Sequence, residues 1–187
     1  VQGRVSQGVS GMKLGKGDSV IGMIVTDDFD TSVLTISKYG MAKRSRLGSG
    51  EMVSNNHEVD EDGNPVFERD GYRKTNRGTK GVKTMSLREG DQIVGVRQIP
   101  DIEDQLFMLT GSGMMIRMAA SQTKETLGKV TKGTRIMELR NADKTGYLDE
   151  IVFVAMLPSE LADPGESSDY SSEEELSLIH ISEPTRR

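Results

Sequence analysis

The stretch Gly81-Val82-Lys83-Thr84-Met85-Ser86-Leu87 repeats the earlier stretch Gly8-Val9-Ser10-Gly11-Met12-Lys13-Leu14 at a distance of 73 residues. When that offset is kept from residue 4 to residue 44, 11 of 41 aligned positions are identical. Ordinary residue usage gives roughly two or three identities over such a length. A third, weaker copy begins at Gly133-Thr134-Arg135-Ile136 and continues at residues 149–154. The chain is therefore an array of internal repeats.

The local pattern inside each copy predicts β-strands. Turn dipeptides Gly-Asp precede β-branched runs at residues 20–25 and 93–96. Apolar strands at 33–37 and 106–110 follow, and a three-residue link ending in glycine joins each to a short cationic strand. No segment shows sustained helical periodicity. We therefore predict an all-β fold of propeller-like repeats, about two and a half blades long.

Charge is distributed unevenly along these repeats. Residues 1–47 and 71–121 each carry a net charge of +3, residues 48–70 carry −6, and residues 163–187 carry −5. A basic body with acidic appendages favours a polyanionic ligand. We predict six segments: a blade repeat at 1–47, an acidic insertion loop at 48–70, a blade repeat with a box-like motif at 71–121, a partial last blade at 122–160, a disordered acidic tail at 161–175, and non-native sequence resembling a translated sequencing adapter at 176–187.

Composition excludes several kinds of site. The chain has no cysteine and two histidines far apart in sequence, which argues against a disulfide, a thiol nucleophile or a histidine metal site. No apolar run is long enough to span a membrane. No nucleophile–base pair or phosphate loop is visible, so we expect no catalytic residue in this chain. Because Val1 is not an initiator methionine, we also expect the chain to be truncated at its start.

Residues 74–83, Lys-Thr-Asn-Arg-Gly-Thr-Lys-Gly-Val-Lys, alternate cations with glycines and small polar residues. Closely spaced Lys and Arg can neutralise successive phosphates of a nucleic acid, and glycine lets the backbone approach closely. The alternative is a solvated turn that carries ordinary surface cations. The recurrence of this pattern at the start of each copy favours the nucleic-acid interpretation.

These residues resemble the blade repeat of the C-terminal domain of the DNA gyrase A subunit, particularly that of the Bacteroidota type. The resemblance covers about residues 1–160. Its motifs are Gly3-Arg4-Val5-Ser6-Gln7-Gly8-Val9, the strand that ends Ala42-Lys43-Arg44, the stretch from Tyr72 to Met85, and Gly128-Lys129-Val130-Thr131-Lys132-Gly133. The box-like motif reads Thr75-Asn76-Arg77-Gly78-Thr79-Lys80-Gly81 and keeps four residues of the family box Gln-Arg-Arg-Gly-Gly-Lys-Gly. It is therefore closer to a degenerate box on a late blade.

The resemblance implies a β-pinwheel whose blades exchange strands and whose basic rim wraps duplex DNA to support ATP-dependent negative supercoiling. It implies two protein partners, the gyrase B subunit together with the remainder of a dimeric gyrase A subunit. It also implies a cytoplasmic, chromosome-associated location. Cleavage chemistry, ATP and Mg²⁺ belong to other parts of such an enzyme, so no cofactor is expected here. The implied DNA contacts are Arg4, Lys13, Lys43, Arg44, Arg46, Arg73, Lys74, Arg77, Lys80, Lys83, Arg117, Lys129, Lys132 and Arg135.

Two alternatives remain open from the sequence. One is the corresponding domain of topoisomerase IV, because late blades of both enzymes carry variant boxes. The other is a propeller that binds proteins, which predicts scattered basic residues and binding that salt does not weaken.

Overall fold

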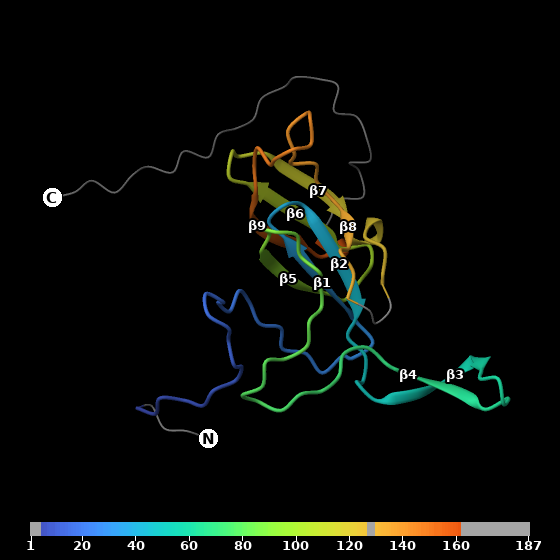
Figure 1. Ribbon diagram of the computed structural model, residues 1–187. Coiled ribbons are helices and arrows are strands. Elements are labelled where there is room, and N and C mark those ends of the chain that lie inside the picture. The colour runs from blue at the N-terminus through green and yellow to red at the C-terminus, as the bar shows by residue number, and fades with distance from the viewer. Residues whose placement is uncertain (1–4, 127–129, 162–187) are drawn as a thin grey trace.

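The computed structural model describes residues 5–126 and 130–161 and shows an all-β chain (Figure 1). Apart from two short 3-10 turns, η1 (Ala120–Gln122) and η2 (Ser159–Leu161), its regular elements there are strands. The all-β prediction is confirmed. The strands are β1 (Ser32–Ser37), β2 (Met41–Arg46), β3 (Met52–Val59), β4 (Pro65–Arg69), β5 (Ile93–Ile99), β6 (Gln105–Thr110), β7 (Met115–Ala119), β8 (Thr134–Arg135) and β9 (Ile151–Leu157).

Each main sheet combines strands from more than one copy of the repeat. Hairpin β1–β2 of the first copy pairs with β5 of the second copy and with β8 of the third, in the order β5-β1-β2-β8. Hairpin β6–β7 of the second copy pairs with β9 of the third, in the order β7-β6-β9. All these pairings are antiparallel. The predicted repeats therefore yield two main sheets, because hairpins β1–β2 and β6–β7 each pair with an edge strand from the next copy.

An aspartate at the matching position of the second and third copies fixes this exchange. Asp91 of the second copy is buried and accepts hydrogen bonds from Ser37 Oγ at 2.8 Å and from the Tyr39 amide at 3.2 Å, at the link of hairpin β1–β2. Asp149 of the third copy accepts hydrogen bonds from the hydroxyl and amide of Ser112, at the link of hairpin β6–β7. The repeated aspartate thus holds the hairpin of the preceding copy.

The predicted strand at residues 20–25 is absent, and this part of the sequence interpretation was wrong. The segment has no regular structure, and Val20, Met23 and Val25 are 69%, 83% and 82% exposed. Its counterparts β5 and β9 each pair with the hairpin of the preceding copy. The described residues contain no hairpin of a preceding copy with which residues 20–25 could pair. A strand without a neighbour has no partners for its backbone groups.

The hydrophobic core lies between the two sheets. Leu34 and Ile36 of β1 belong to the same buried cluster as Leu106 and Met108 of β6, and all four side chains are fully buried. Gly95 allows β5 to approach β9 closely, because a Cβ at this position would lie 3.0 Å from a methyl group of Val154 in β9. Burial of four large apolar side chains contributes about 1.5–3 kcal/mol for each. The two sheets therefore stabilise one another.

The segment 48–70, expected as a loop, instead contains the β3–β4 hairpin, which projects from the body (Figure 1). We call residues 51–69 the arm. Its strands carry Val53, Val59 and Phe67, and its turn is closed by Asp60, which accepts hydrogen bonds from the backbone amides of Asp62 and Asn64. The prediction of a loop was wrong because the acidic character of the segment concealed its β-formers. The division of the chain at residues 47, 70, 121 and 160 stays a prediction, and residues 162–187 lie outside the described part.

The glycine that opens each copy has a structural role that can be tested. Gly8, Gly81 and Gly133 have φ values of 80°, 77° and 75°, and a Cβ on Gly133 would lie 2.3 Å from the carbonyl oxygen of Ala42. We expect Gly133→Ala to lower the free energy of unfolding by roughly 1–3 kcal/mol, measured by urea titration. Gly113→Ala is the control, since Gly113 has φ 89° but no atom within 4 Å of its Cβ position. Equal losses in the two variants would show that the close approach to Ala42 contributes nothing.

Candidate nucleic-acid interface

The cationic loop, residues 73–83, joins the arm to the second copy and lies against the start of the first copy. The amide of Gly78 donates to the carbonyl of Gly11 at 2.9 Å, and the amide of Lys13 donates to the carbonyl of Thr79 at 2.9 Å. A parallel bridge between Met12 and Thr79 accompanies these bonds. The backbone of the loop is therefore held in place although it contains no strand.

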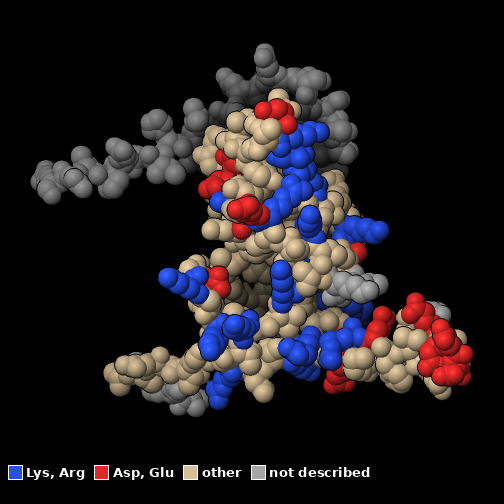
Figure 2. Space-filling view, in the orientation of Figure 1, with Lys and Arg blue, Asp and Glu red and all other residues tan. Residues whose placement is uncertain are grey.

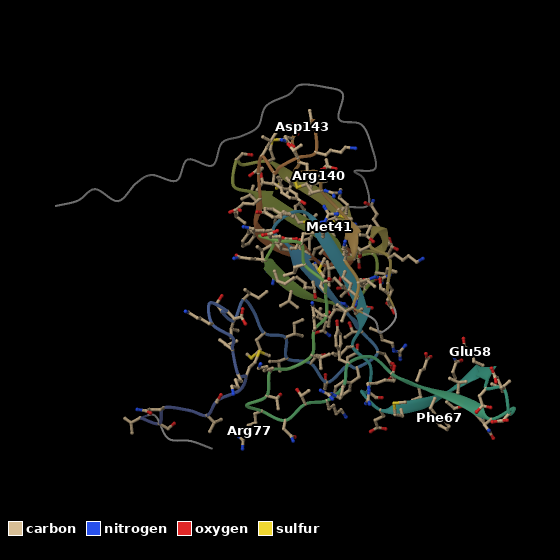
Figure 3. The ribbon with its side chains drawn as sticks, viewed as in Figure 1. Met41, Glu58, Phe67, Arg77, Arg140 and Asp143 are labelled. Atoms are coloured by element: carbon tan, nitrogen blue, oxygen red, sulfur yellow. The ribbon has the colours of Figure 1, made fainter. Side chains whose placement is uncertain are left out.

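The side chains of the cationic loop point their charges into solvent. Arg73, Arg77, Lys80 and Lys83 are exposed and have no hydrogen-bond or ion-pair partner among the described residues. Figure 3 places Arg77 at the outer end of the loop, directed away from the body. Lys74 lies over the ring of Phe29, with its Nζ atom 5.6 Å from the ring centroid, and stays exposed. Unpaired cations at this density are typical of a surface that binds phosphates.

Lys13 of the first copy and Lys132 of the third copy are exposed cations like those of the cationic loop. Both side chains are exposed and unpaired within residues 5–126 and 130–161. Lys13 adjoins Thr79 through its backbone hydrogen bond, so it belongs to the same surface as the cationic loop. Arg4 and Lys129, which were predicted as DNA contacts, lie outside the described residues.

Lys43 and Arg44 do not present their charges at the surface as expected. They are 3% and 9% exposed. Lys43 Nζ donates to the carbonyl of Thr84 at 2.8 Å, and Arg44 Nε donates to the carbonyl of Thr123 at 2.9 Å. Burial lowers the pKa of the Lys43 ammonium from its ordinary value. The reason is topological: β2 has strands on both sides, and its cations are covered by the following segments.

Arg46 and Arg117 are also engaged by groups of the chain itself. Arg46 is paired with Asp30 at 2.8 Å and with Asp70 at 3.0 Å. The exposed Arg117 lies 5.6 Å from the ring centroid of Phe107.

Arg135 shares a carboxylate with Arg140. Glu138 lies 3.1 Å from Arg135 and 2.8 Å from Arg140. The hydrogen bonds from Arg140, assisted by the charge of Arg135, lower the pKa of Glu138 to about 2. This carboxylate is therefore ionised at neutral pH, so Arg135 offers less charge to an external anion than the residues of the cationic loop.

A cleft of about 720 Å³ lies where the arm meets the body. We call it the arm cleft. Sequence reasoning did not identify it, because its walls come from three distant segments. Its lining comprises Lys43, Ser45 and Arg46 of β2, Val53, Glu68 and Arg69 of the arm, the following residues Asp70, Gly71, Tyr72 and Arg73, and Val82, Lys83 and Thr84.

The arm separates positive from negative charge along its length. Its end carries Glu58, Asp60, Glu61 and Asp62, whereas its base adjoins Arg46, Arg69 and Arg73. Figure 2 shows Asp and Glu gathered at the end of the arm, and Lys and Arg where the arm meets the body. A polyanion is therefore attracted to the base of the arm and repelled from its end.

The described part lacks two features, a candidate metal site and a helix that could span a membrane. Residues 5–126 and 130–161 contain no group of three or more His, Asp or Glu side chains able to hold a metal ion. No helix in these ranges is long and apolar enough to cross a membrane. Tyr39 stacks on Tyr147 with ring centroids 3.8 Å apart, and the hydroxyl of Tyr72 hydrogen-bonds that of Thr84. These three tyrosines are thus engaged in structural contacts, and Tyr170 lies outside the described residues.

A family of known proteins matches this chain. The profile described as "DNA gyrase C-terminal domain, beta-propeller" matches residues 1–27, 66–100 and 104–148. The DNA gyrase A subunit of Campylobacter jejuni is 31% identical over 168 residues, which are 89% of this chain and 16% of that protein. The DNA gyrase A subunit of Helicobacter pylori is 30% identical over 79% of this chain and 15% of its own length. The chain thus spans about a sixth of the length of these relatives.

Among solved structures, the E. coli ParC C-terminal domain matches 79% of this chain and 49% of its own chain, with 18% identity and a TM-score of 0.48.

Proposed function

Since this chain belongs to the DNA gyrase C-terminal domain family, whose fold is a β-propeller, we propose that it binds and wraps duplex DNA as part of a gyrase A subunit. In that role it supports the introduction of negative supercoils, with DNA cleavage and ATP hydrolysis carried out by other parts of the enzyme. Its partners are duplex DNA, the gyrase B subunit, and the remainder of the dimer of gyrase A subunits. It acts on the chromosome in the bacterial cytoplasm.

The observation that carries this proposal is the set of unpaired cations on the cationic loop. Wrapping requires contacts to the phosphate backbone rather than to base edges, because the same surface must hold many sequences. Arg77, Lys80 and Lys83 meet this requirement, since they are exposed and no described carboxylate neutralises them. Affinity then comes from the release of counterions, and any preference among sequences comes from the bendability of the duplex.

Binding of the full chain to a long duplex, measured by fluorescence anisotropy across a salt series, tests the proposal. Phosphate contacts made by the six cations Lys13, Arg73, Lys74, Arg77, Lys80 and Lys83 predict a fall in affinity of roughly 10³-fold between about 50 and 200 mM salt. Two duplexes of equal length and bendability but different sequence should bind equally well.

Two results would contradict this function. One is a folded chain that shows no binding at low salt, and the other is binding that salt leaves unchanged. Circular dichroism on the same samples establishes that the chain is folded, so that loss of structure is not mistaken for loss of an interface.

A further inference from the structure

The arm cleft carries an excess of positive charge. Its lining contains five cations and two carboxylates, which gives a net charge of +3. Of the cations, Arg46 is paired with Asp70 at 3.0 Å, and Arg69 donates to the carbonyl of Gly50 at 2.7 Å. Arg73 and Lys83 have no partner among the described residues. These two charges are therefore available to an anion that enters the cleft.

Ser45, which lines the cleft, carries a buried hydroxyl without a partner. Ser45 is 5% exposed, and its Oγ is the one buried side-chain polar atom of the described residues that lacks a hydrogen bond. Leaving a buried hydroxyl unpaired costs about 1–3 kcal/mol. Ser45 and Lys43 lie two residues apart on β2, so both point to the face of the strand opposite to the buried Ala42. A ligand with strong acceptor oxygens would satisfy this donor.

We propose that the arm cleft seats a phosphate group of the DNA backbone, which accepts a hydrogen bond from Ser45 and lies between the charges of Arg73 and Lys83. This inference rests on the proposed function and adds a contact that the repeat motif does not predict. Most of the arm, residues 51–65, falls outside the ranges matched by the family profile.

The position of the cleft favours a backbone phosphate over a free anion. Arg73 and Lys83 stand at the two ends of the cationic loop, so a duplex held by the loop passes the mouth of the cleft. Glu58, Glu61 and Asp62 at the far end of the arm repel the duplex toward the base. The volume of about 720 Å³ accommodates a sugar–phosphate unit.

Ser45→Ala is the decisive variant, because it removes the hydroxyl without removing charge. We expect DNA affinity to fall roughly tenfold, with the salt dependence unchanged, since a hydrogen bond to a charged group is lost and no counterion release is altered. Resistance to urea should stay the same or increase, because an unpaired buried donor disappears. Ser121→Ala, at an exposed serine outside the cleft, is the control and should leave affinity unchanged.

Arg73→Gln/Lys83→Gln tests the two charges. Because the two cations hold a single phosphate, their loss reduces the slope of log affinity against log salt by about 0.9. Lys124→Gln/Lys144→Gln, which removes two exposed cations outside the cleft, should keep the original slope. Wild-type affinity in both Ser45→Ala and Arg73→Gln/Lys83→Gln, with salt-dependent binding of the unmodified chain intact, would overturn the cleft site and leave the proposed function standing. Absence of binding by the unmodified chain would overturn both.

Titration with inorganic phosphate distinguishes a site for a DNA backbone phosphate from a site for a free phosphate ion. Amide resonances of residues 43–46 and 73 should shift when the duplex is added, and millimolar phosphate should weaken that response by competition. A shift with inorganic phosphate but none with duplex would show a site for free anions and overturn the assignment to DNA.

Discussion

Replacing Lys74, Arg77 and Lys80 together by alanine is expected to lower the affinity for duplex DNA by 10²- to 10³-fold at about 0.1 M salt. Each lost phosphate contact reduces the slope of log affinity against log salt by about 0.9, so three contacts reduce it by about 2.7. The three side chains are exposed and lie on an irregular loop, so their truncation leaves both sheets intact. Thermal unfolding of the variant should match that of the unmodified chain.

Lys124→Ala/Lys144→Ala is the control for the effect of net charge. That variant also removes exposed positive charge, but from outside the cationic loop. If DNA responds to net charge alone, both variants lose affinity in proportion to the charges removed. If the loop is the interface, the loss per charge is far larger for Lys74, Arg77 and Lys80. An unchanged salt slope in the triple variant would show that the loop is structural.

The repeat in the sequence predicted the hairpins well and their assembly poorly. The strands expected at 33–37, 93–96 and 106–110 are present, because β-branched runs and glycine-ended links are local signals. Which hairpin receives a given edge strand is a long-range choice that spacing does not reveal. For that reason the resemblance, rather than the periodicity, suggested strand exchange, and residues 20–25 were wrongly expected to be a strand.

In the candidate interface too, the local sequence predicted some features, whereas contacts with residues far along the chain could not be predicted. Glycines and alternating cations at 74–83 predicted phosphate contacts. The structure exposes Lys74, Arg77, Lys80 and Lys83, and their contact with DNA stays a prediction. The pattern Met41-Ala42-Lys43-Arg44 resembles an exposed strand, yet Lys43 and Arg44 are covered by residues about 40 and 80 positions later in the chain. The arm cleft was missed for the same reason, since Ser45 and Lys83 meet only in three dimensions.

Leu106→Ala should produce the largest loss of stability of the substitutions considered. Leu106 is fully buried, in the same core cluster as Leu34 and Ile36 of the other sheet. Truncation of a buried leucine removes its transfer free energy and leaves a cavity, which together cost about 2–5 kcal/mol. Whole domains are stable by only about 5–15 kcal/mol, so this single change removes a large share of the total. Urea titration followed by circular dichroism measures the loss.

Leu109→Ala is the matched control, because the same residue type lies on the same strand but on the opposite face and is 37% exposed. If the core lies between the exchanged sheets, Leu109→Ala costs less than half as much as Leu106→Ala, since less apolar area is lost and no closed cavity forms. Equal losses would show that both faces of β7-β6-β9 are buried in solution. That result would contradict the two-sheet arrangement, in which β9 of the third copy and β5 of the second copy each complete the hairpin of the copy before them.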